Sequence, residues 1–228
     1  MKSEINVLLV EDQVNDAELC EHELKRAGFR FTSRRVCTRA ALEAALGDFS
    51  PDVILSDFSM PTDMDGLDAL SMARAQAPDV PFVFVSGTIG EERAVEALKS
   101  GATDYVLKDK LQRLGPVVRR ALQEAGDRRA VVQTQTALRE SEARFRSFME
   151  HLPGQASIRD HEGRYTFVNE AWEKAYGLTA SAALGKRSDE VLGTYDEDLT
   201  GVHQRVLETG VAVSGVLQKG AAGDEKWW

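Results

Sequence analysis

Five side chains that could carry phosphoryl-transfer chemistry lie in the first half of the chain. Each stands at the end of a short apolar run: Glu11 and Asp12 after 5–10, Asp57 at the end of 51–57, Ser86 after 81–85, and Lys108 after 105–107. Runs rich in Val, Ile, Leu and Phe, separated by helix-like stretches, are typical of parallel strands buried on both faces. Reactive groups in such open sheets collect beyond the carboxyl ends of the strands. We therefore expect the five side chains to converge on one edge of one sheet.

Three acids, a hydroxyl and an amine suit Mg²⁺-assisted phosphoryl transfer to a carboxylate. A carboxylate at the tip of a buried strand, such as Asp57, is costly unless a cation or its own chemistry uses it. Mg²⁺ takes oxygen ligands and offsets the repulsion between acids and an incoming phosphoryl group. Lys108 offers a point charge on a flexible stem, and Gly87 leaves the mouth of the pocket open. The alternative for any single acid is a helix cap or a salt bridge.

These residues resemble the receiver domain of two-component response regulators, over roughly residues 4–125. The stretches Phe82–Glu92 and Gly101–Lys108 match that family in residue type and spacing. The resemblance implies an acceptor aspartate that is phosphorylated by a histidine kinase or a phosphotransfer protein. Its implied roles are as follows: Asp57 is the phosphoacceptor, Glu11, Asp12, Asp57 and the main-chain carbonyl of Ser59 are Mg²⁺ ligands, and Ser86, Gly87, Tyr105 and Lys108 form the switch and phosphate-binding set.

Two features depart from the family pattern. Many receivers have a cis-proline after the lysine, whereas here Asp109 follows Lys108. A cis bond to a residue other than proline costs roughly 2.5–4 kcal/mol, so we expect a trans bond or a different loop path. The loop at 60–66 is also about one residue longer than usual. Neither departure removes a reactive group.

The elements that must position these residues alternate between strand and helix. We expect strands at 5–10, 31–36, 52–57, 81–86 and 104–107, and helices at 14–27, 39–47, 66–76, 91–100 and from about 111. Gly28, Gly47 and Gly101 stand where a left-handed helix cap is wanted. The fold class is α/β, a doubly wound five-stranded parallel sheet in the order 2-1-3-4-5.

Composition sets broad limits on function. The chain has 228 residues, 43% hydrophobic and 29% charged, which is ordinary for a globular protein. A net charge of −9 argues against a nucleic-acid-binding surface. Two cysteines without metal spacing suit a cytoplasmic location, and no segment predicts a signal sequence or a membrane span.

The last helix of the receiver is predicted to continue as a linker. Apolar residues recur every seven positions in two sets, whose registers differ by one residue: 111, 118, 125 and 132, then 131, 138, 145 and 152. The shift predicts a break or stagger near Gly126. A parallel dimeric coiled coil is the preferred interpretation and implies a homodimer; a solvated amphipathic connector is the alternative.

The pattern changes to short strands after Pro153. A hairpin is predicted at 156–168 with its turn at Gly163, followed by a helix capped by Asn169. The residues from Arg159 to Trp172, with 176–178, 184–186 and 207–210, resemble a PAS sensory domain, an α+β fold with an antiparallel sheet. We therefore expect three parts: receiver at 1–125, linker at 126–143 and PAS at 144–228. The PAS part is expected to be incomplete, within a longer polypeptide that carries an output domain such as a histidine kinase or a cyclic-dinucleotide enzyme.

The ligand of the PAS part stays open. A flavin photosite needs a reactive cysteine, which this half lacks. A haem needs an axial side chain, and His203, on a helix expected at 196–208, is more often structural. We expect neither cofactor, and we expect Phe167, Trp172, Tyr176 and Val191 to fill a core or line a small apolar pocket. His151 lacks the context of a kinase phosphoacceptor.

The favoured function is two-component signal transduction, in which a phosphorylatable receiver is joined to a PAS sensor. One alternative is a dimerisation or binding module in which phosphorylation is incidental; the complete set of reactive residues speaks against it. An aspartate-nucleophile phosphatase would want a second Asp at position 59, where this chain has Ser59. A helix-turn-helix regulator would want a basic recognition helix after residue 125. No stand-alone enzyme is therefore assigned.

Overall fold

A computed structural model describes residues 4–61, 63–87, 91–192, 204–212, 217–219 and 225–227. It divides into two compact units, Met1–Thr136 and Ala137–Trp228. Their elements in chain order are β1 (Ile5–Val10), α1 (Val14–Arg26), β2 (Phe31–Val36), α2 (Arg39–Asp48), β3 (Val53–Ser56), α3 (Gly66–Gln76), β4 (Phe82–Ser86), α4 (Glu91–Lys99), β5 (Asp104–Leu107), the 3₁₀ helix η1 (Lys108–Arg113), α5 (Leu114–Glu150), β6 (Ser157–Arg159), β7 (Tyr165–Val168), α6 (Glu170–Tyr176), α7 (Ala180–Ala183), α8 (Ser188–Leu192), β8 (Leu217–Lys219) and β9 (Glu225–Trp227).

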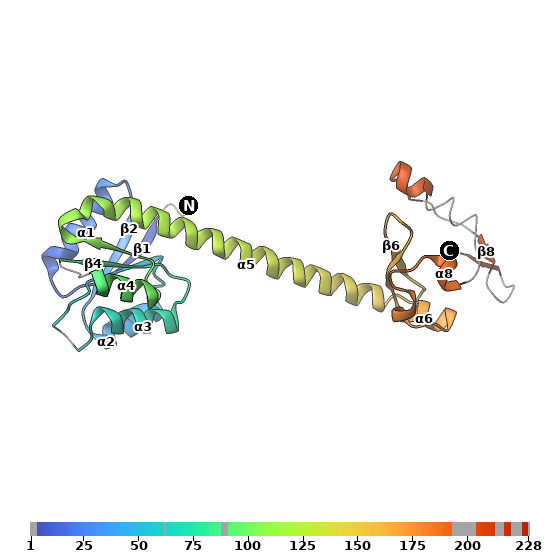
Figure 1. Cartoon of the computed structure of the whole chain (residues 1–228), viewed down its shortest axis with the longest axis horizontal. Coiled ribbons are helices and arrows are strands. Elements are labelled where there is room, and N and C mark those ends of the chain that lie inside the picture. Colours follow the sequence, from blue (N-terminus) through green and yellow to red (C-terminus); the bar gives the residue numbers. More distant parts are fainter. Residues whose placement is uncertain are drawn as a thin grey trace. The chain divides into compact units, whose positions relative to one another are not determined.

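The first unit is a three-layer α/β sandwich, as predicted. Its five strands are parallel in the order β2-β1-β3-β4-β5. Helices α1 and α5 pack on one face of the sheet through Leu24 and Val118, and helices α2 and α3 pack on the other through Leu42 and Leu70 (Figure 1). The three central strands are buried along nearly their whole length, which explains their continuous apolar sequence.

Two of the three glycines expected to cap helices have the left-handed backbone. Gly28 has φ 83° and Gly101 has φ 102°. The expectation was wrong for Gly47, which lies inside α2 (Arg39–Asp48). The helix runs on past it, and the positive φ falls on Ser50 at 49°. Helix α2 therefore ends without the aid of a glycine, since the turn into β3 comes three residues later than expected.

The linker helix differs from the prediction at both the start and the middle. Residues Lys108–Arg113 form a 3₁₀ helix, and α5 starts only at Leu114. No break occurs near Gly126, because α5 is one helix from Leu114 to Glu150. Gly126 makes the helix less stable than an alanine would, but a single glycine does not end a helix when the residues around it favour the helical conformation. The peptide bond after Lys108 is trans, as expected.

The first apolar set packs on the receiver only as far as Ala125, because Val132, its last member, is 61% exposed. Leu114, Val118, Ala121 and Ala125 are buried, the first three with no more than 1% of their surface exposed. From Asp127 to Phe148 every residue is exposed. Any seam for a partner helix therefore begins after Ala125, where Val131, Leu138, Phe145 and Phe148 are each more than half exposed.

The second unit has a small core around an antiparallel hairpin, as predicted for its first part. Strands β6 and β7 pair, Gly163 takes the left-handed turn position at φ 80°, and Asn169 caps α6. Trp172 is 3% exposed. The centroid of its ring lies 5.3 Å from the ring centroid of Tyr165 and 4.8 Å from that of Tyr176. These aromatic rings fill the core together with Val191. His203 and most of the helix expected at 196–208 lie outside the described residues.

Candidate functional site

The site lies at the carboxyl edge of the parallel sheet. Strands β1 and β3 are neighbours, and their register pairs Val10 with Ser56. The next residues along the two strands are Glu11 and Asp57, so parallel pairing alone brings them to the same edge. Strand β5 ends at Leu107, which pairs with Ser86 of β4, and places Lys108 at that edge as well.

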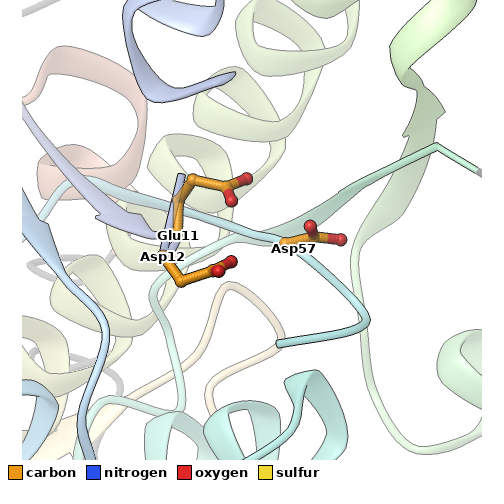
Figure 2. Close-up of side chains that lie close together, drawn as sticks. All are labelled: Glu11, Asp12 and Asp57. Atoms are coloured by element: carbon orange, nitrogen blue, oxygen red, sulfur yellow. The ribbon is translucent and has the colours of Figure 1, made fainter. Parts of the chain in front are cut away.

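Glu11, Asp12 and Asp57 form an acidic cluster. Each offers a carboxylate oxygen, and these oxygens all lie within 4.8 Å of one another. Figure 2 shows the three side chains together at the ends of their strands, with the carboxylates of Glu11 and Asp12 extending toward the side on which Asp57 lies. Glu11 is 4% exposed and Asp57 is 9% exposed. Several acids held this close require a nearby positive charge, because their mutual repulsion and burial are both unfavourable.

Lys108 supplies that charge. Its Nζ lies 2.8 Å from Oδ2 of Asp57, 3.0 Å from Oε2 of Glu11 and 2.5 Å from Oδ2 of Asp16. Burial of Lys108 favours the neutral amine, but hydrogen bonds to the three carboxylates outweigh it and raise the pKa of this side chain above its ordinary value. The amine is therefore a permanent cation at neutral pH.

Main-chain groups fix the orientation of the acids. The amide of Phe58 donates to Oδ1 of Asp57 at 2.6 Å, and the amide of Ser59 donates to the same oxygen at 3.3 Å. The amide of Gln13 donates to Glu11, while Arg35 donates to the carbonyls of Glu11 and Asp12 at 2.9 and 3.2 Å. Burial is the largest influence on Glu11 and raises the pKa of its carboxyl, despite the hydrogen bonds that favour its charged form.

The other predicted site residues lie around this cluster. Ser86 is buried at the end of β4. Tyr105 of β5 pairs with Phe84 and packs, half-buried, against the core cluster on the α2 and α3 side. A Cβ atom built on Gly87 would meet no atom of the described residues within 4 Å, which agrees with an open approach at this point. Ser59 is exposed, and its amide is already engaged with Asp57.

Asp16 and Arg35 also contact residues of the site, and neither was predicted from the sequence. Asp16 lies in the first turn of α1, where an acid is commonly explained by the helix dipole alone. Arg35 belongs to the edge strand β2, in which no site residue was predicted. The one available signal was position: Asp16 follows the acid pair within a βα connection, and such connections overlie the carboxyl edge of the sheet.

The donor set fits a small divalent cation such as Mg²⁺. Three closely spaced carboxylates match the oxygen ligands that Mg²⁺ prefers, and their excess negative charge would be reduced on binding. When bound, the ion would supply charge neutralisation for an incoming phosphoryl group. Glu11, Asp12 and Asp57 are the residues that would hold it.

Comparison with known proteins identifies both halves of the chain. Residues 7–119 match the family model of the response regulator receiver domain, and residues 149–228 match the PAS fold. The receiver match covers the five-stranded parallel sheet of the first unit, and the PAS match includes the hairpin of β6 and β7 in the second unit. No helix among the described residues is long and apolar enough to cross a membrane.

The curated relatives share the first part of the chain. The regulatory protein AtoC of Escherichia coli (strain K12) is 37% identical over 118 residues, covering 51% of this chain and 25% of AtoC. The C4-dicarboxylate transport transcriptional regulatory protein DctD of Rhizobium meliloti is 32% identical over 144 residues, covering 63% of this chain and 30% of DctD. The chain thus spans less than a third of the length of either relative.

A solved structure of a related protein is similar to the first part of this chain. NtrX from Brucella abortus is 30% identical, with a TM-score of 0.52, over 57% of this chain and 29% of NtrX.

Proposed function

Because this chain carries a response regulator receiver domain of two-component signal transduction followed by a PAS fold, we propose that its receiver accepts a phosphoryl group on Asp57. The observation that carries the proposal is the contact of 2.8 Å between Nζ of Lys108 and Oδ2 of Asp57, beside three carboxylates within 4.8 Å of one another. A binding module in which phosphorylation is incidental is not favoured, since such a module would not need this costly cluster.

The transfer forms one bond and breaks one. A carboxylate oxygen of Asp57 attacks the phosphorus of a phosphohistidine on a histidine kinase or phosphotransfer protein. The new O–P bond forms as the P–N bond breaks, and the imidazole nitrogen leaves and takes up a proton from solvent. Lys108 is placed to neutralise a phosphoryl oxygen, and the fixed orientation of Asp57 by the Phe58 amide favours in-line attack.

The proposed role for Mg²⁺ rests on the same donor set. Glu11, Asp12 and Asp57 would be its side-chain ligands, with the carbonyl of Ser59 as a further ligand. Asp57 would then serve both as a ligand and as the acceptor, so that metal and phosphoryl group meet at one carboxylate.

We further propose that Ser86 and Tyr105 transmit the phosphorylated state. Ser86 and Lys108 stand at the ends of paired strands, and Tyr105 pairs with Phe84, two residues before Ser86. A phosphoryl group that draws the Ser86 hydroxyl inward would leave room for the half-buried Tyr105 ring. The surface that changes would be formed by α4, β5 and α5, and α5 continues toward the PAS part.

The parts of the chain are proposed to work in series: receiver at 1–125, helical linker at 126–143 and PAS sensor at 144–228. Two copies are proposed to associate through the linker helix, whose exposed apolar residues would otherwise face water.

The decisive experiment measures phosphate uptake by intact mass. Wild type, Asp57→Ala and Asp63→Ala are incubated with Mg²⁺ and acetyl phosphate; Asp63 is an exposed acid in the loop after β3. One phosphoryl group should appear on wild type and on Asp63→Ala, and none on Asp57→Ala. Equal uptake by Asp57→Ala would refute the assignment of the acceptor.

A further inference from the structure

Lys108 has as many carboxylate partners as it has protons to donate. A lysine ammonium has three donors, and Nζ of Lys108 contacts one oxygen each of Glu11, Asp16 and Asp57. A phosphoryl group that arrives at Asp57 and needs this ammonium must therefore take it from at least one of these partners.

Asp16 differs from the other two partners. Glu11 and Asp57 belong to the cluster that can hold a divalent cation, whereas Asp16 does not. Asp16 also lies on another element, the first turn of α1, and its side chain is 32% exposed against 5% for Glu11 and 11% for Asp57. Among the described residues, Lys108 is the hydrogen-bonding partner of its carboxylate.

The position of Asp16 keeps its carboxylate within reach of Lys108. The N-terminal turn of a helix favours a negative side chain, because the helix dipole is positive there. The helix itself is fixed on the sheet by Ala17, Cys20 and Leu24, which are buried. The carboxylate of Asp16 is therefore firmly placed on the α1 side of Lys108.

We propose that Asp16 is a positioning residue for Lys108 that competes with the phosphoryl group for its ammonium. In the unphosphorylated protein Asp16 holds the ammonium toward α1. When a phosphoryl group occupies Asp57, Lys108 turns from Asp16 to a phosphoryl oxygen, and the strength of the Asp16 contact lowers the affinity of the site for the anion. This inference rests on the proposed phosphorylation of Asp57.

The test measures the binding of beryllofluoride, a phosphoryl mimic, in the presence of Mg²⁺. Asp16→Asn keeps the size of the side chain and removes its charge. It should bind beryllofluoride about three- to tenfold more tightly than wild type, as expected for loss of one partly exposed ion pair in a coupled network. Asp16→Glu, which retains a carboxylate, should stay closer to wild type than Asp16→Asn.

A second background separates an effect through Lys108 from an effect of charge alone. Lys108→Gln should weaken beryllofluoride binding, and adding Asp16→Asn to it should change the affinity by less than about twofold. Glu18→Gln serves as the matched control, because it removes an exposed acid two residues along α1 on a different face. It should bind beryllofluoride as wild type does.

A readout without the anion checks the contact itself. The ¹⁵Nζ resonance of the Lys108 ammonium should be protected from exchange with water in wild type and should lose protection in Asp16→Asn but not in Glu18→Gln. An unchanged resonance, an unchanged affinity in Asp16→Asn, or an equal gain in the Lys108→Gln background would each overturn the competition. A wild-type protein that binds no beryllofluoride would instead overturn the proposed phosphorylation, and the competition with it.

Discussion

The two carboxylate oxygens of Asp57 are held by different kinds of group, and Lys108 holds only one of them. Oδ2 contacts the ammonium of Lys108 at 2.8 Å, while Oδ1 accepts the Phe58 amide at 2.6 Å. A rigid main-chain donor and a flexible charged side chain have different consequences. The amide fixes the orientation of the carboxylate, and the ammonium can move away without disturbing that orientation.

Asp12 should matter more than Glu11 for metal binding. Glu11 already has a partner in Lys108, whereas the carboxylate of Asp12 accepts from the side chain of Gln13 and is less buried. Mg²⁺ stabilises the fold if it binds only the folded state. We expect Asp12→Ala to reduce the rise in melting temperature produced by Mg²⁺ more than Glu11→Ala does. The reverse order in a metal titration would contradict this expectation.

Glu11 should make the receiver less stable as the pH rises. Burial raises the pKa of its carboxyl above the ordinary value of 4.5 in the folded state. Between the unfolded and folded pKa values the folded state holds more protons, so the free energy of unfolding decreases with rising pH. The stabilisation is complete below about pH 4.5 and is lost as the pH passes the folded pKa.

Glu11→Gln should remove this dependence. Denaturant unfolding followed by circular dichroism, with a chelator present, can be compared for the two proteins between about pH 4 and 8. The difference in the free energy of unfolding, wild type minus variant, should decrease with rising pH. A difference that increases would show that ion pairing to Lys108 outweighs burial.

Gly66 should resist substitution because it lies against the backbone of Asp57 and Phe58, just after β3. A Cβ atom there would lie 2.6 Å from the carbonyl oxygen of Asp57 and 2.8 Å from Cα of Phe58. We expect Gly66→Ala to lower the free energy of unfolding by about 1–3 kcal/mol, since backbone must shift to relieve the clash. The same shift would displace Asp57, so the rate of phosphate uptake should fall as well.

Gly126→Ala is the matched substitution with the opposite expected sign. A Cβ atom at Gly126 meets nothing within 4 Å, and the residue lies inside the continuous helix α5. Alanine should therefore stabilise the helix by about 0.5–1 kcal/mol. Destabilisation at this position would mean that the helix does break there, as the register shift in the sequence suggested.

Asn169 should be essential to the fold of the second unit. Its side-chain oxygen accepts from the amides of Ala156 and Trp172, and its side-chain nitrogen donates to the carbonyls of Gly154 and Met149. The residue is completely buried, so no water replaces these partners.

We expect Asn169→Ala to lower the free energy of unfolding of this unit by about 2–4 kcal/mol. Asn169→Asp should also destabilise it, because a carboxylate keeps the two acceptor contacts but loses both donations. Tryptophan fluorescence reports on this half alone, since the tryptophans are Trp172, Trp227 and Trp228. A loss of stability in the receiver, followed separately by its phosphate uptake, would contradict this local role.

The exposed face of α5 should mediate association of two chains. Leu138 is 58% exposed and follows Val131 by seven residues, the spacing of a coiled-coil seam. Leu138→Glu should weaken dimer formation at least tenfold in sedimentation equilibrium. Gln133→Glu places the same charge two residues after Val131, off the seam, and should leave the dimer intact. A monomer in wild type would make the linker a solvated connector.

The sequence determined the sheet, its strand order and the edge where Asp57, Glu11, Asp12 and Lys108 meet. Local patterns were enough, because strands buried on both faces are continuously apolar and parallel strands present their carboxyl ends together. The hairpin and the Asn169 cap were predictable for a similar reason, since each depends on residues within about a dozen positions.

Only the tertiary structure decided the contacts between distant elements. Asp16 and Lys108 are 92 residues apart in the chain, and no local pattern links them. No local pattern links Arg35 to the carbonyls of Glu11 and Asp12 either. The apolar residues at the start of α5 have a spacing that suits packing on a sheet and packing on a partner helix equally well. Periodicity specifies which face of a helix is apolar, but what covers that face depends on the packing of the whole domain.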